Sequence, residues 1–123
     1  MLLFHGFPSA SHMFRDLMPM LEDKFHCIAP DYPGFGNTDS PSREEFAYTF
    51  DHLAEAIDGF IEALHIDKFY MYVFDYGAPI GFRIALKLPE KILGMCCCRL
   101  MEVAIMASLT ESHAKMRLYE TWL

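Results

Sequence analysis

The stretch Val73-Phe74-Asp75-Tyr76-Gly77-Ala78-Pro79 ends an aromatic, strand-like run and opens a helix-like run. One acidic residue, Asp75, stands between the two runs, and small residues follow shortly after it. This is the layout of a nucleophile elbow, a sharp strand-to-helix turn that presents one side chain. Gly77 supplies the small residue two positions after Asp75, whereas Val73, two positions before it, relaxes the pattern.

The sequence around Asp75 is compatible with two roles for its carboxylate. An aspartate side chain has an unperturbed pKa near ~3.9, so it is ionised at neutral pH and can attack carbon without a general base. The other role is an N-cap at the start of the following helix, where aspartate is common. The motif alone leaves both roles open.

Apolar, strand-like runs alternate with amphipathic stretches throughout the chain. We expect strands at 1–4, 26–30, 69–74 and 92–98. We expect helices at 13–21, 50–64 and 79–88, the first two capped by Ser11 and Thr49. Such alternation predicts βαβ units and a parallel sheet.

Two further glycine-containing motifs follow the first two expected strands. His5-Gly6-Phe7-Pro8 comes after the first strand, where a glycine loop can present a backbone N–H to an anionic oxygen. Asp31-Tyr32-Pro33-Gly34-Phe35-Gly36 comes after the second strand, at the start of a loop that runs to Ser42. The second motif is equally compatible with an ordinary loop that has no direct part in catalysis.

Taken in this order, the three motifs resemble the α/β-hydrolase superfamily, in the branch that contains epoxide hydrolases and haloalkane dehalogenases. The resemblance covers residues 1–94. It implies an α/β class and a partial α/β-hydrolase fold, with a parallel sheet of about four strands and flanking helices. The implied strand order is second, first, third, fourth, numbered as the expected strands occur along the chain.

The resemblance also implies roles for the motif residues. Asp75 matches the family's aspartate nucleophile, which forms an alkyl-enzyme ester. Phe7 and Tyr76 match the residues whose backbone N–H groups form the oxyanion hole. The residues that match the structural parts of the motifs are His5, Gly6, Pro8 and Gly77.

The implied substrate is a small electrophile, either an epoxide or an alkyl halide. Haloalkane dehalogenases usually carry an asparagine after His-Gly and a tryptophan after the nucleophile, and these positions hold Phe7 and Tyr76 here. The resemblance therefore favours an epoxide-hydrolase-like function, with a haloalkane-dehalogenase-like function as the alternative.

The family's catalytic histidine and its supporting acid have no counterpart in this sequence, and His113 is not expected to replace the histidine. We therefore expect a fragment, with a partial core at 1–94 and a divergent tail at 95–123. Segment 95–108 stands where the family carries an Asn-Gly-rich segment, and a one-base frame shift over 101–107 would explain the difference. A catalytically inactive interaction protein or a pseudogene product is the alternative.

Composition and charge limit the kinds of binding partner that we expect for the chain. The net charge is −7 with no basic run, which argues against nucleic acid. No apolar run reaches the ~18–20 residues of a membrane span, and the start lacks the charged region of a signal peptide, so a cytoplasmic location is expected. The cysteines, Cys27 and 96–98, lack metal-ligand spacing, so neither a metal nor a cofactor is expected. Open sheet edges predict self-association.

Overall fold

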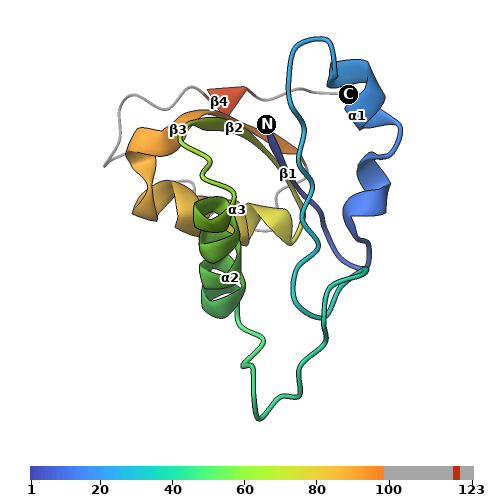
Figure 1. Ribbon diagram of the computed structural model, residues 1–123, viewed down its shortest axis with the longest axis vertical. Coiled ribbons are helices and arrows are strands. Elements are labelled where there is room, and N and C mark those ends of the chain that lie inside the picture. The colour runs from blue at the N-terminus through green and yellow to red at the C-terminus, as the bar shows by residue number, and fades with distance from the viewer. Residues whose placement is uncertain (99–117, 120–123) are drawn as a thin grey trace.

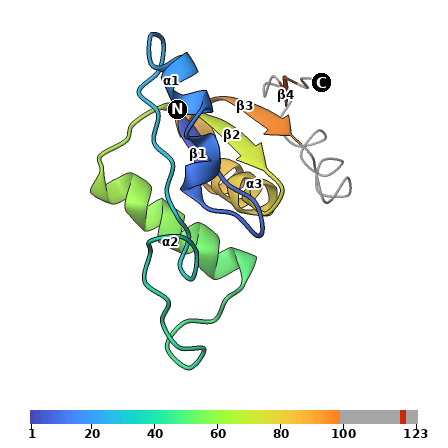
Figure 2. The ribbon, with the colours of Figure 1, turned by 90° about the vertical axis from the view of Figure 1, so that its right-hand side faces the viewer.

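The computed structural model describes residues 1–98 and the backbone of 118–119. Its sheet contains four parallel strands in the order β1 (Leu2–Phe4), β2 (Phe69–Phe74), β3 (Ile92–Cys98) and β4 (Leu118–Tyr119). Strands β2 and β3 lie side by side and point the same way (Figure 2). The predicted α/β class, with a parallel sheet of about four strands, is confirmed.

The strand expected at 26–30 is much shorter than predicted. It pairs with β1 through one parallel bridge between Leu2 and Ile28, with hydrogen bonds of 2.9 Å from Leu3 N to Ile28 O and from Ile28 N to Met1 O. Pro30 lacks the N–H that a longer ladder would need. The predicted strand order is still observed, because the bridge to Ile28 lies on the side of β1 away from β2.

Helices α2 (Phe50–Ala63) and α3 (Gly77–Lys87) form a layer on one face of the sheet (Figures 1 and 2). Thr49 caps α2 as predicted, since its hydroxyl accepts from His52 N at 3.2 Å. Helix α3 begins two residues before the predicted start, and Pro79 stands in its first turn, where its missing N–H costs nothing. Leu64, the last residue of the helix predicted at 50–64, lies past the end of α2 and is exposed.

The prediction of a single helix at 13–21 is wrong. The structure has a 3₁₀ helix η1 (Ser11–Phe14) and a short helix α1 (Leu17–Leu21). Pro19 is tolerated in the first turn of a helix but not in its interior, so the helix begins anew at Leu17. Ser11 does not cap the segment with its side chain, and its backbone N–H instead donates to Asp31 Oδ1 at 2.6 Å.

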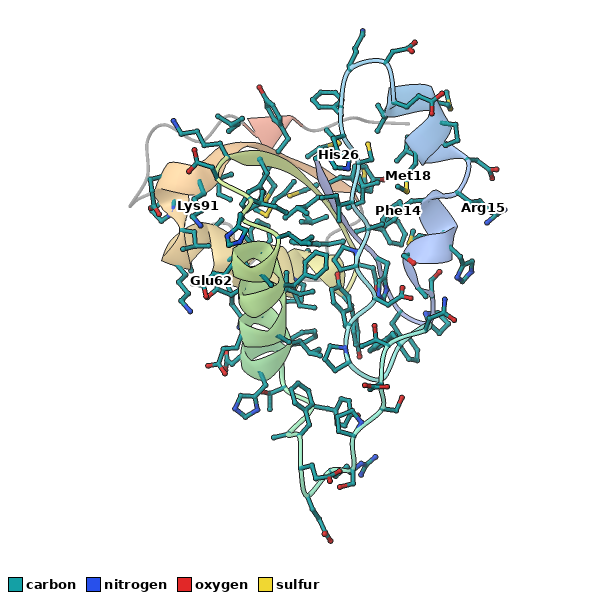
Figure 3. All side chains as sticks on the ribbon, in the orientation of Figure 1. Phe14, Arg15, Met18, His26, Glu62 and Lys91 are labelled. Atoms are coloured by element: carbon teal, nitrogen blue, oxygen red, sulfur yellow. The ribbon has the colours of Figure 1, made fainter. Side chains whose placement is uncertain are left out.

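The two sheet faces differ because side chains alternate along each strand. Met71 and Val73 of β2 are buried in the core, with Leu53, Ile57 and Ile61 of α2. On the opposite face, Tyr72 meets the Phe14 ring edge-on at 5.7 Å. Figure 3 shows Phe14 and Met18 pointing toward the strands, whereas Arg15 points away from them.

A further 3₁₀ turn, η2 (Pro89–Lys91), leads from α3 into β3. Strand β3 carries Cys96, Cys97 and Cys98, which like Cys27 are partly buried. Partial burial raises the pKa of Tyr72 well above its ordinary value, and hydrogen bonding to Cys98 adds to this effect. No helix in the described part of the chain is long and apolar enough to cross a bilayer.

Candidate active site

Asp75 lies between the end of β2 and the start of α3, at the carboxyl end of the strand. Its backbone φ is 51°, in the left-handed region that non-glycine residues rarely adopt. Such strained single residues cluster at functional sites. The structure therefore contains the strand–turn–helix elbow that the motif predicted, with Asp75 at its apex.

Three glycines make room for the elbow. A Cβ on Gly77 would collide with the carbonyl oxygen of Phe4, and one on Gly6 would lie 2.5 Å from the Cβ of Asp75. Gly81, one turn into α3, faces Val73, whose Cγ1 would lie 2.5 Å from an added Cβ. Gly81 therefore compensates for the large residue at position 73, a pairing that the sequence analysis missed although two glycines four apart in an apolar helix signal close packing.

Two backbone N–H groups converge on the Asp75 carboxylate. Phe7 N donates to Oδ1 at 2.9 Å and Tyr76 N donates to the same atom at 2.8 Å. Within the described residues, Oδ2 accepts no hydrogen bond. The structure thus brings together the three residues predicted for the nucleophile and the oxyanion hole, although they come from positions 68 residues apart in the chain.

The N-cap alternative for Asp75 does not match this geometry. Residue Tyr76 occupies the N-cap position of α3, and no side chain caps that helix. The carboxylate bonds instead to Phe7 N, which follows a different strand. The bond from Ala78 N goes to the backbone carbonyl of Asp75 at 2.9 Å rather than to its side chain.

Aromatic rings line the site in a continuous row, which we call the aromatic row: Phe35, Phe7, Tyr76 and Phe50. Neighbouring ring centroids lie 6.5, 5.4 and 5.1 Å apart in that order. Phe7 is 58% exposed, while the other three rings are partly buried. Phe35 and Phe50 were not predicted to belong to the site, since nothing local in the sequence places them beside Phe7.

His5 is buried and its two ring nitrogens are both engaged. Nδ1 lies 3.2 Å from Gly6 O, and Nε2 accepts from Tyr32 N at 3.4 Å. Burial lowers the pKa of His5 against the opposing effects of Gly6 O and Asp31, so the ring is held neutral. It stacks on Tyr32 at 4.1 Å. These contacts give His5 a structural role in the fold, and leave no ring nitrogen to act as a base toward Asp75.

Asp31 organises the loop of the second motif rather than the site itself. Its Oδ1 accepts from Ser11 N at 2.6 Å and its Oδ2 accepts from Asn37 N at 3.0 Å. Gly36, with φ 53°, lies so close that a Cβ would collide with this carboxylate. Burial alone would raise the pKa of Asp31, but the hydrogen bonds from Asn37 and Ser11 outweigh burial and hold that pKa below its ordinary value.

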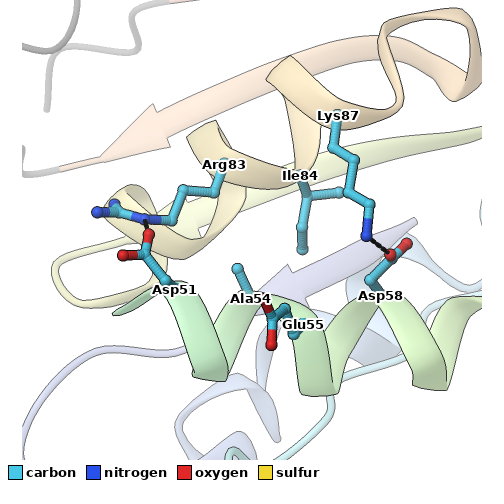
Figure 4. Close-up of a pocket in the computed structure, with 7 residues that line it drawn as sticks. All are labelled: Asp51, Ala54, Glu55, Asp58, Arg83, Ile84 and Lys87. Carbon is cyan, nitrogen blue, oxygen red and sulfur yellow. Dashed lines mark hydrogen bonds and ion pairs between the residues drawn. The ribbon is translucent and has the colours of Figure 1, made fainter. Parts of the chain in front are cut away.

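A second group of charged residues lies between α2 and α3, around a cavity of about 330 Å³ (Figure 4). Arg83 pairs with Asp51 and Lys87 pairs with Asp58, each at 2.5 Å. Asp58 is buried, and its Oδ1 has no hydrogen-bond partner within the described residues. Asp75 does not line this cavity, so the two groups are separate. Among the described residues, no group of three or more His, Cys, Asp or Glu side chains could hold a metal ion.

The α/β-hydrolase fold family model matches residues 1–122. The chain therefore belongs to the α/β-hydrolase superfamily, as the three motifs predicted.

Individual relatives sharpen this assignment. The chain is 54% identical over 94 residues to the uncharacterized hydrolase YNR064C of Saccharomyces cerevisiae, covering 76% of this chain and 32% of the relative. It is 37% identical over 94 residues to haloalkane dehalogenase 2 of Mycobacterium tuberculosis, with the same coverage of both chains. The fold superposes on haloalkane dehalogenase DbeA from Bradyrhizobium elkani with a TM-score of 0.74 at 32% identity, over 78% of this chain and 32% of that one.

The coverage values also show how large a part of each relative the chain matches. It spans about a third of the length of the relatives that it matches. The aspartate-nucleophile branch suggested by the motifs fits the haloalkane dehalogenases among these relatives. The tail expected at 95–123, including the proposed frame shift at 101–107 and His113, lies mostly outside the described residues, so the boundary at residue 94 stays a prediction.

Proposed function

We propose that this chain carries the nucleophile portion of an α/β-fold hydrolase, in which Asp75 attacks an electrophilic carbon and forms an alkyl-enzyme ester. The observation that carries the proposal is the pair of N–H donors on one oxygen of Asp75. Oδ1 is held by the Phe7 and Tyr76 amides, while Oδ2 is left without a hydrogen bond within the described residues. A fixed carboxylate with one unbonded oxygen is suited to nucleophilic attack.

The first half-reaction needs no base in this arrangement. Oδ2 forms a bond to the substrate carbon as the bond from that carbon to the leaving atom breaks, and the leaving atom takes the electron pair. With an epoxide the leaving atom is the ring oxygen, which then takes a proton from water. The Phe7 and Tyr76 amides stay on Oδ1, which becomes the carbonyl oxygen of the ester.

The second half-reaction, hydrolysis of the ester, needs a positioned base that activates water, an effect worth typically ~10²–10⁴-fold. Both nitrogens of His5 are engaged, so His5 does not supply that base. The sequence also offers no counterpart to the family's catalytic histidine, and we therefore expect the ester on Asp75 to accumulate after one turnover.

An epoxide is the first candidate substrate. Phe7 and Tyr76 place a phenyl and a phenol where a dehalogenase would usually carry an asparagine and a tryptophan. An alkyl halide is the second candidate, and the similarity to proteins named haloalkane dehalogenases favours it. The alternative to both is a catalytically inactive interaction protein. Self-association and a cytoplasmic location remain predictions from the sequence.

Intact mass spectrometry tests the proposal. The chain is incubated with a reactive terminal epoxide and, in parallel, with a primary alkyl bromide. We expect one adduct per chain, mapping to Asp75 and absent in Asp75→Asn, with no further consumption of the electrophile. Asp39→Asn is the matched control, because Asp39 is an exposed aspartate that is not among the residues bonded at the elbow. An adduct spread over several carboxylates, or one that persists in Asp75→Asn, would count against an assembled nucleophile.

The same experiment separates the alternatives. Sustained turnover of many equivalents would show that a base is present, with His113 the first residue to substitute. No adduct with either electrophile would favour the inactive interaction protein.

A further inference from the structure

Phe7 combines two properties at the candidate site. Its backbone N–H holds Asp75 Oδ1 at 2.9 Å, and its side chain is 58% exposed. Single exposed apolar side chains are common on protein surfaces and need no explanation by themselves. This one is set apart by its position, because the residue that orients the carboxylate also presents an open aromatic surface next to it.

The Phe7 ring contacts two neighbouring aromatic rings. The Tyr76 ring lies 5.4 Å away and is tilted by 32°, and the Phe35 ring meets it nearly edge-on at 6.5 Å and 88°. Tyr76 is held in turn by Phe50 at 5.1 Å. These contacts favour one orientation of the ring while the residue stays 58% exposed, which is the condition for a preorganised contact surface.

We infer that the Phe7 ring determines substrate specificity, by stacking on an aryl group carried by an electrophile whose reacting carbon reaches Asp75 Oδ2. The inference rests on the proposed function and names the class of substrate. Aromatic rings in offset or edge-to-face contact gain affinity beyond that from apolar burial alone. A flat ring fits the uncovered part of Phe7 better than a puckered aliphatic ring of the same carbon number.

The geometry links this contact to reactivity. The Phe7 amide fixes Oδ1, and the ring of the same residue is joined to the backbone Cα through a single carbon atom, Cβ. An aryl group on the ring is therefore positioned relative to the carboxylate by a single residue. Holding both reactants in one frame of this kind raises the rate of attack as well as the affinity.

The test compares two epoxides that differ in the ring alone. Benzyl oxirane and cyclohexylmethyl oxirane each carry the ring one methylene from the epoxide, so their intrinsic reactivities are similar. The rate of adduct formation at Asp75 is followed by intact mass spectrometry under single-turnover conditions. We expect the native chain to react roughly two- to tenfold faster with the benzyl compound, the range that aromatic pairing supplies.

Variants assign the preference to Phe7. Phe7→Leu should bring the rate ratio close to one, and Phe7→Tyr, which keeps the ring, should preserve it. Tyr70→Leu is the matched control, since Tyr70 is an aromatic residue of similar exposure, 40%, at the opposite end of β2. Circular dichroism of each variant shows that the fold is retained, and the exposed position of Phe7 makes that the expected result.

The outcomes are distinct. A ratio near one in the native chain, or an unchanged ratio in Phe7→Leu, overturns the role of Phe7 while leaving Asp75 as the nucleophile. If Tyr70→Leu also abolishes the preference for the benzyl compound, the preference is a general effect of aromatic residues, and the inference is overturned as well. No adduct with either epoxide overturns the proposed function, and this inference with it.

Discussion

The carboxylates of this protein are held in two different ways in two regions of the molecule. Near the carboxyl ends of β1 and β2, Asp75 and Asp31 accept hydrogen bonds from backbone N–H groups. Between α2 and α3, Asp51 and Asp58 accept them from the side-chain cations of Arg83 and Lys87 (Figure 4).

The difference shows which region keeps a charged side chain in a fixed position. A backbone donor cannot move without moving the chain, whereas the cations of the helix layer sit on long side chains that lose entropy when they pair. The backbone donors also leave one oxygen of Asp75 unbonded, on a residue that is only partly buried. The first region suits a reacting group, and the second suits the joining of two helices.

Glycine substitution should separate the two regions most strongly. In Gly77→Ala the new methyl group would collide with the Phe4 carbonyl, and overpacking of this kind costs about 1–3 kcal/mol or more. Gly59 is the matched control, because it is an exposed glycine in α2 with nothing near its Cβ position. Gly59→Ala should raise the free energy of unfolding by about 0.5–1 kcal/mol. Urea denaturation measures both, and a stabilised Gly77→Ala would show that the elbow is not tightly packed.

Replacement of Asp31 tests how much the hydrogen bonds from backbone N–H groups to its carboxylate contribute to the free energy of unfolding. Asp31→Asn keeps the shape but turns one acceptor into a donor that faces an N–H, which should cost about 1–3 kcal/mol at neutral pH. Asp39→Asn, in the same loop, should change little.

The same variant gives a pH test. The pKa of Asp31 is lower in the folded chain than its ordinary value of 3.8, so its stabilising effect is present above pH 4 and is lost as the pH falls through the folded-state pKa. The stability difference between the native chain and Asp31→Asn should therefore shrink below pH 4. A difference that is constant from pH 7 to pH 3 would contradict the assignment of the effect to the charged carboxylate.

The smallest effect is expected for the exposed ion pair of the helix layer, that of Asp51. Lys87→Met leaves the buried Asp58 carboxylate without its cation, and should lower the Tm by more than Asp51→Ala does. Asp51 is 72% exposed, so its loss should shift the Tm by less than about 2 °C. Thermal unfolding followed by circular dichroism makes the comparison. An Asp51→Ala effect equal to that of Lys87→Met would show that burial of Asp58 adds nothing to its pair.

The sequence by itself determined the elements whose signals are local. The elbow at Asp75, the Thr49 cap and the place of Pro79 in the first turn of α3 were all predicted. Each depends on the residues within one turn of it, through helix capping, proline geometry or the need for small side chains beside a sharp turn. The order of the three motifs then indicated the superfamily, and through it the meeting of Phe7 and Tyr76 at Asp75.

Tertiary structure alone decided the features that depend on contacts between distant residues. Asp31 takes the Ser11 N–H, so the predicted Ser11 cap does not form. The strand predicted at 26–30 is reduced to one bridge. Lys87 pairs with Asp58, which lies 29 residues away in the sequence. Likewise, the aromatic row joins rings from two loops, the elbow and the start of α2. No local pattern contains such contacts, because they are chosen by which surfaces the packed sheet and helices bring together.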